Sequence, residues 1–76
     1  MSATDYQYIN AILECGSITD AAKKLFISQS ALSQYIKRIE LKLGIEIFDR
    51  SFSPIKLTEA GKIYLRSLTD IMAIEE

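Results

Sequence analysis

Two helical segments joined by a very short turn constrain the fold of this chain more than any other feature. Residues 17–26 and residues 28–43 both repeat apolar side chains at helical spacing, and the turn between them has no more than the three residues Phe-Ile-Ser. Ser17 and Ser28 are suited to cap the two helix N-termini, and Gly44 is suited to end the second helix. Helices joined so tightly must cross at a steep angle. The pattern therefore predicts a helix-turn-helix.

The segments on either side complete a small winged domain. Residues 5–15 form an amphipathic helix that Thr4 or Asp5 can cap and Gly16 can end. Residues 45–50 and 54–57 read as two short strands around the turn Ser-Phe-Ser. We therefore predict a mainly α fold, a winged helix-turn-helix with a three-helix core and a short β-hairpin wing.

A final helix follows the hairpin. Thr58 can cap it, and its apolar side chains form a stripe that is wider than one small core requires. We predict two parts, a winged helix-turn-helix domain over residues 1–57 and a linker or dimerisation helix over residues 58–76.

The helix over residues 28–43 has two contrasting faces. Leu32, Ile36 and Ile39 lie on an apolar face, whereas a polar face carries Ser30, Ser33, Gln34 and Lys37. The predicted core side chains of this helix and the one before it are Ala22, Leu25, Leu32, Ile36, Ile39 and Leu43. The polar face is either ordinary solvated surface or a surface that binds a partner. Glu40 either pairs with Arg50 or faces water, and we favour a structural role for it.

The composition excludes several function classes. Cys15 is the single cysteine and histidine is absent. The chain therefore lacks the residues that an internal disulfide, a zinc site or a Cys/His catalytic pair requires. The carboxylates fall at predicted helix surfaces, turns and caps, which indicates a binding protein and not an enzyme. We expect no metal and no cofactor. Neither a membrane span nor a signal peptide is recognisable, so we expect a cytoplasmic protein with no membrane partner.

The charge is unevenly distributed. The formal net charge is -1, which by itself argues against a nucleic-acid partner. All nine lysines and arginines, however, lie between Lys23 and Arg66 with only four acidic residues, so this stretch carries a charge of +5. A basic middle between acidic ends is compatible with DNA binding.

An ordered set of short motifs extends from Ile9 to Gly61 without a gap. In sequence order they include GSIT at 16–19, AA at 21–22, ISQSALS at 27–33, YIKRIE at 35–40, LG at 43–44, IF-x-R at 47–50 and LT-x-AG at 57–61, where x is a position outside the motif. This set resembles the N-terminal winged helix-turn-helix domain of the LysR-type transcriptional regulators of bacteria. The resemblance implies sequence-specific binding of double-stranded DNA, with the recognition helix 28–43 in the major groove and the wing 45–57 against the backbone and minor groove.

The resemblance and the side-chain chemistry together suggest site residues. Short polar side chains near the start of a recognition helix can read base edges, and these are Gln29, Ser30, Ser33 and Gln34. The predicted phosphate contacts are side chains or helix N-termini at Thr19, Ser28, Lys37, Arg38, Arg50 and Lys56. The predicted wing tip consists of Ser51, Phe52, Ser53 and Pro54.

Three positions depart from the family pattern. Position 30 is often proline in this family, position 34 is commonly basic, and the wing often carries a basic residue near its tip, whereas this chain has Ser30, Gln34 and Ser-Phe-Ser-Pro. We therefore expect a base preference different from that of typical members. The acidic total and the altered wing also leave an alternative open, a winged-helix protein-interaction module without DNA affinity.

In the family that the chain resembles, the last helix packs against its twin. The implied partners are a second copy of the chain and a partly palindromic operator, and the predicted dimerisation residues are Ile63, Tyr64, Leu68, Ile71 and Met72. A charge at Leu68 or Ile71 is then expected to break the dimer and leave the helices intact. Simple packing of this helix on the first helix is the alternative.

Family members generally continue into an effector-binding domain, so we expect a small-molecule effector to act only through a domain absent from this chain. The chain is then either an excised DNA-binding domain or a natural short protein.

Overall fold

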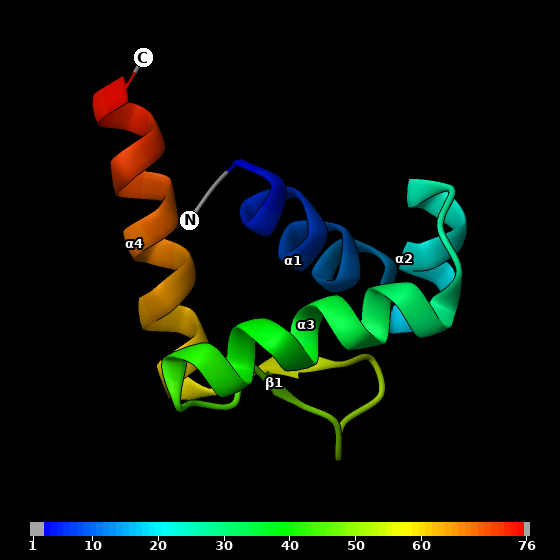
Figure 1. The fold of residues 1–76 in the computed structure, drawn as a ribbon. Coiled ribbons are helices and arrows are strands. Elements are labelled where there is room, and N and C mark those ends of the chain that lie inside the picture. Colours follow the sequence, from blue (N-terminus) through cyan, green and yellow to red (C-terminus); the bar gives the residue numbers. More distant parts are fainter. Residues whose placement is uncertain (1–2, 76) are drawn as a thin grey trace.

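The computed structural model of the protein describes residues 3–75, with side chains described for residues 3–71. The elements in chain order are α1 (Ala3–Cys15), α2 (Ile18–Leu25), α3 (Gln29–Leu43), β1 (Phe48–Asp49), β2 (Lys56–Leu57) and α4 (Glu59–Glu75). In Figure 1, α1, α2 and α3 form one body, the hairpin lies beside α3, and α4 extends away from the far end of α3. The predicted winged helix-turn-helix followed by a long helix is confirmed.

Local side-chain chemistry explains where the helices begin and end. The Ser17 hydroxyl accepts a hydrogen bond from the Asp20 amide at 3.1 Å, and the Ser28 hydroxyl accepts one from the Ala31 amide at 3.0 Å. Each serine thus satisfies one of the amides that a helix N-terminus leaves without a partner. Gly44 ends α3 in the left-handed conformation, with φ of 70°. The cap predicted for α1 is wrong: the helix already begins at Ala3, so Thr4 and Asp5 lie in its first turn.

The core lies where α1, α2, α3, β1 and α4 meet. Its largest fully buried side chains are Ile9, Ile12, Leu32, Ile36, Ile47 and Leu68. Full burial of one such side chain contributes roughly 1.5 to 3 kcal/mol, so these few residues dominate the stability of a small domain. Leu25 and Ile39 pack against this core only in part. The prediction that Leu43 belongs to the core is wrong, since it is 41% exposed at the last position of α3.

The hairpin is shorter than predicted but firmly anchored. Its antiparallel strands pair Phe48 with Leu57 and Asp49 with Lys56. Pro54 has no amide to donate and therefore cannot extend the ladder. Instead, the Ile55 amide donates to the Gly16 carbonyl at 3.0 Å, which ties the wing to the turn between α1 and α2.

The start of α4 is fixed against Ile47, the residue just before β1. The Thr58 hydroxyl accepts from the Gly61 amide at 2.9 Å, and the Thr58 amide donates to the Ile47 carbonyl at 3.0 Å. A Cβ at Gly61 would lie 2.1 Å from the Ile47 carbonyl oxygen, so only glycine allows this approach. In the part of the chain that the structure describes, we find no helix with the length and apolar character to span a membrane.

Candidate nucleic-acid interface

The first turns of α3 present the polar side chains that the sequence indicated. Gln29, Ser30 and Gln34 are exposed, and Ser33 is half-buried. The Gln34 amide nitrogen lies 3.4 Å from the Ser30 hydroxyl, so the two side chains occupy one side of the helix. All of these groups can donate or accept hydrogen bonds, and the helix they stand on is held rigidly by its buried opposite face.

A groove separates this side of α3 from the wing. Its volume is about 510 Å³, and it is lined by Ser30, Ser33, Gln34, Lys37, Glu40, Glu46, Phe48 and Arg50. The structure thus brings three of the four predicted base-contact residues together with two of the predicted phosphate contacts, Lys37 and Arg50. The groove thus holds hydroxyl, amide and cationic groups that can bind phosphate and base edges, beside the carboxylates of Glu40 and Glu46.

Glu40 connects α3 to the base of the wing. One oxygen of its carboxylate accepts a hydrogen bond from the Ile47 amide at 2.7 Å, and the other lies 3.7 Å from the Arg50 guanidinium. The Glu40 side chain is 15% exposed, whereas that of Arg50 is 49% exposed. Both the pairing with Arg50 and the structural role favoured for Glu40 are confirmed. Its bond to the Ile47 amide was not foreseen, because that contact depends on how the chain turns after Gly44.

The two helix N-termini lie in different settings. Thr19 is exposed in the first turn of α2. Ser28 is also exposed, and its hydroxyl oxygen already accepts from the Ala31 amide, so the hydroxyl can still donate its own proton to an anion. The first amides of α3 point out of the helix end, where the dipole favours a negative group.

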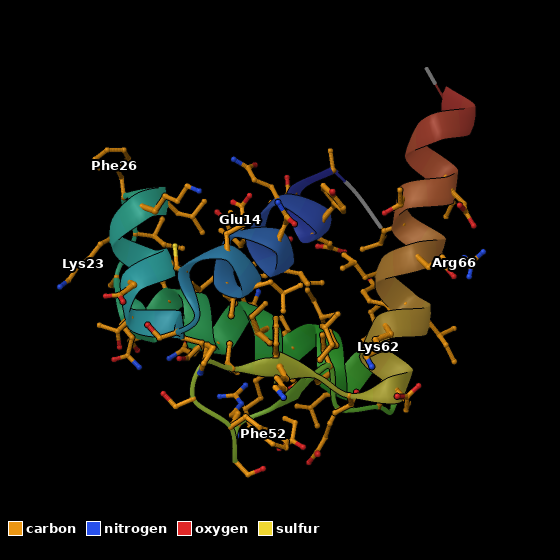
Figure 2. All side chains as sticks on the ribbon, turned by 180° about the vertical axis from the view of Figure 1, so that it is seen from behind. Glu14, Lys23, Phe26, Phe52, Lys62 and Arg66 are labelled. Carbon is orange, nitrogen blue, oxygen red and sulfur yellow. The ribbon has the colours of Figure 1, made fainter. Side chains whose placement is uncertain are left out.

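The wing projects as an exposed loop. Ser51, Phe52, Ser53 and Pro54 are all exposed, and the Ser53-Pro54 peptide bond is cis. The hydroxyl and the amide of Ser51 donate to the Asp49 carboxylate, and these bonds lower the pKa of Asp49. Figure 2 shows Phe52 on this loop.

Lys56 lies in a different place from the predicted phosphate contacts in the groove. Its ammonium lies 4.4 Å from the centre of the Phe52 ring, in a cation–π contact, and not among the residues that line the groove. A phosphate contact by Lys56 therefore remains a prediction for a separate part of the surface.

Arg38 lies on a side of α3 different from that of Lys37. It lines a second groove of about 450 Å³ with Asp5, Tyr35, Ile39, Lys42, Leu43 and Tyr64. Consecutive helix residues point about 100° apart, which explains the separation. Within this groove, burial and then the Asp5 carboxylate raise the pKa of Tyr64. Arg38 and Lys37 therefore line different parts of the surface of α3.

The predicted dimerisation residues divide between surface and core. Ile63 is 69% exposed and Ile71 is 39% exposed, whereas Tyr64 is half-buried. Leu68 is only 2% exposed and belongs to the core of the protomer, so its prediction as a dimer contact is wrong. The stripe on α4 serves the domain's own core as well as its outer surface. The side chain of Met72 lies outside the described residues.

Comparison with known proteins identifies the family. The model of the family described as "Bacterial regulatory helix-turn-helix protein, lysR family" matches residues 3–62. This range includes α1, α2, α3, the wing and the start of α4. The chain belongs to the lysR family. Its curated relatives are named as transcriptional regulators and not as enzymes.

Two relatives show how much of a LysR-type regulator this chain represents. The HTH-type transcriptional regulator MetR of Haemophilus influenzae is 40% identical over 62 residues, which are 82% of this chain and 20% of MetR. A probable RuBisCO transcriptional regulator of Cyanidium caldarium is 44% identical over 68 residues, 90% of this chain and 22% of that protein. The chain thus spans about a fifth of the length of the curated relatives it matches.

Solved structures of LysR-type proteins share the fold. The BenM DNA-binding domain in complex with catB site 1 DNA superposes with a TM-score of 0.82 and 33% identity, covering 96% of this chain and 78% of that one. The CbnR DNA-binding domain in a DNA complex gives a TM-score of 0.81 and 31% identity, covering 99% of this chain and 86% of that one. Both neighbours are DNA-bound domains.

Proposed function

We propose that this chain is a sequence-specific, double-stranded DNA-binding domain of a bacterial LysR-type transcriptional regulator. Residues 28–43 enter the major groove, and residues 45–57 contact the backbone and minor groove. The observation that carries the proposal is the groove between α3 and the wing, which gathers Lys37 and Arg50 beside Ser30, Ser33 and Gln34. In this arrangement one DNA backbone strand runs between helix and wing, because the two elements reach into neighbouring grooves.

The chemistry of α3 supports separate roles along the helix. Gln29, Ser30 and Gln34 are exposed near the end that enters the groove, and glutamine can bond both edge groups of adenine. Lys37 lies further along the same side of the helix, where a cation meets phosphate more readily than bases. The DNA-binding domains of BenM and CbnR, which share this fold and were solved in complex with DNA, favour DNA over a protein partner.

We further propose that two copies bind a partly palindromic operator in the cytoplasm. Residues 1–57 supply the DNA contacts, and residues 58–76 supply the linker and dimer helix through the exposed Ile63 and Ile71. Two-fold symmetric dimers of helix-turn-helix domains present their recognition helices about 34 to 36 Å apart, one turn of DNA. The MetR relative is about four times as long as this chain, which supports the proposal that any response to a small-molecule effector depends on residues outside this chain.

Selection from a random duplex pool tests the function directly. The chain is incubated with the pool at low and at physiological salt, and bound fragments are sequenced. An enriched, partly palindromic motif is the expected result. No enrichment even at low salt would refute DNA binding and favour a protein-interaction module with the winged fold.

Two alanine variants separate base contacts from phosphate contacts. Gln29→Ala should cost about 1 to 3 kcal/mol on the preferred site and much less on random duplex, because lost base bonds carry the discrimination. Lys37→Ala should weaken both duplexes nearly alike and lower the slope of log affinity against log salt by about 1. Lys62→Ala is the matched control, since this exposed lysine lies on α4 (Figure 2). Equal effects of Gln29→Ala and Lys37→Ala on random DNA, with the motif unchanged, would mean that the polar face is only solvated surface.

A further inference from the structure

One carboxylate joins three helices at the second groove. Asp5 lies in the first turn of α1, and its two oxygens accept hydrogen bonds from the hydroxyls of Tyr35 on α3 and Tyr64 on α4, the latter at 3.3 Å. All three residues are partly buried. The recognition helix and the linker helix are therefore connected through a single side chain that belongs to neither of them.

Beyond its first turn, α4 is held to the rest of the domain mainly by apolar packing, in which Leu65 takes part. The first turn itself is fixed by the Thr58 amide, which donates to the Ile47 carbonyl, and by the Thr58 hydroxyl, which donates to the Glu46 carbonyl. Further along, Leu68 inserts into the core. Apolar burial depends on area and has little directional preference, whereas a hydrogen bond weakens when its angle changes. The Asp5 to Tyr64 bond, one turn of helix after Gly61, is the directional contact that adds a second fixed point to the helix axis.

We propose that Asp5 is a positioning residue: by holding Tyr35 and Tyr64 together it sets the angle between α4 and the recognition helix. In a dimer built on α4, this angle determines which separation of two half-sites the pair of recognition helices fits. The inference rests on the proposed function, and it assigns operator spacing to a contact between helices within one copy of the chain.

The geometry gives such a contact a large effect on DNA. Paired recognition helices lie about 34 Å apart, so a rotation of about 10° at the linker moves one of them by roughly 6 Å relative to the other. One base-pair step along the duplex is about 3.4 Å. If the angle of α4 varies by a few degrees more, the distance between the two recognition helices varies by more than one base-pair step. Two linked half-site contacts cannot both form when that distance does not match the separation of the half-sites.

Duplexes with variable spacing test the inference. Two copies of the selected half-site are placed at separations that differ by single base pairs, and the affinities of the wild type, Tyr64→Phe and Asp5→Ala are compared. Tyr8→Phe is the matched control, because the Tyr8 ring contacts Tyr35 but is not one of the two tyrosines bonded to Asp5 in the structure. Both test variants should keep the half-site motif, while the preference for the best separation over its neighbours falls by roughly threefold or more. Tyr8→Phe should keep the wild-type profile.

Several outcomes would refute the inference about Asp5 and leave the proposed function unaffected. These are a wild type that binds the half-site with no preferred spacing, test variants that keep the wild-type profile, or a Tyr8→Phe profile that changes as theirs do. If the wild type enriches no duplex in the selection experiment, that result refutes the proposed function instead. Residual dipolar couplings of the free chain then still measure the angle between α3 and α4. An angle and spread in Tyr64→Phe equal to those of the wild type would contradict the positioning role of Asp5.

Discussion

Removing the Glu40 carboxylate should destabilise the domain more than its surface position suggests. The side chain is 15% exposed, and it accepts the Ile47 amide at 2.7 Å. Ile47 itself is fully buried, so its amide cannot turn to water when the carboxylate is gone. Glu40→Ala therefore leaves a buried donor without an acceptor.

The magnitude follows from the two contacts. A hydrogen bond to a charged group contributes about 1.5 to 3 kcal/mol, whereas an ion pair with a half-exposed arginine contributes less than about 1 kcal/mol. Glu40→Ala should thus lower the free energy of unfolding by about 2 to 3 kcal/mol. Glu40→Gln keeps a neutral oxygen acceptor for the Ile47 amide and should lose about 1 kcal/mol. The total free energy of unfolding of a 76-residue domain is roughly 4 to 11 kcal/mol, so the alanine substitution removes a large share of it.

Urea unfolding followed by circular dichroism measures the difference. Glu46→Ala is the matched control, because Glu46 is an exposed glutamate one position before Ile47. The expected order of stability is wild type and Glu46→Ala together, then Glu40→Gln, then Glu40→Ala. If Glu40→Ala were as stable as Glu46→Ala, the bond to the Ile47 amide would not stabilise the wing as argued.

Three further perturbations distinguish core from surface. Leu68→Glu should unfold the domain, because it buries a charge in the core, whereas Ile63→Glu should keep the helical circular dichroism signal and shift the mass in solution toward monomer. A Leu68→Glu variant that is folded and monomeric would show that Leu68 is a dimer contact after all. Gly61→Ala should destabilise by about 1 to 3 kcal/mol or more in thermal unfolding, although alanine is the better helix former, since its Cβ meets the Ile47 carbonyl; an increase in stability would refute that contact. Ser51→Ala should return the pKa of Asp49 toward its ordinary value in an NMR titration, because the Ser51 hydroxyl bond lowers it; an unchanged titration would show that the hydroxyl bond is not formed in solution.

Local sequence signals determined the order and type of the elements. Ser17, Ser28 and Thr58 cap their helices as predicted, because a cap requires only residues within one turn of each other. The same holds for Gly16 and Gly44, both of which have positive φ where a helix ends. The polar side of α3 was also predictable, since the side chains of one helix face follow from spacing alone.

Tertiary structure decided which residues of each face meet a neighbour. The α4 stripe fits a core contact and a dimer contact equally well as a pattern, and only the packing shows that Leu68 turns inward while Ile63 stays exposed. Arg38 and Lys37 are adjacent in sequence yet line different grooves. Asp5 lies 30 residues from Tyr35 and 59 from Tyr64 in sequence, so no local pattern could reveal their hydrogen bonds. Contacts between distant segments depend on how whole helices cross, and helix periodicity carries no information about that angle.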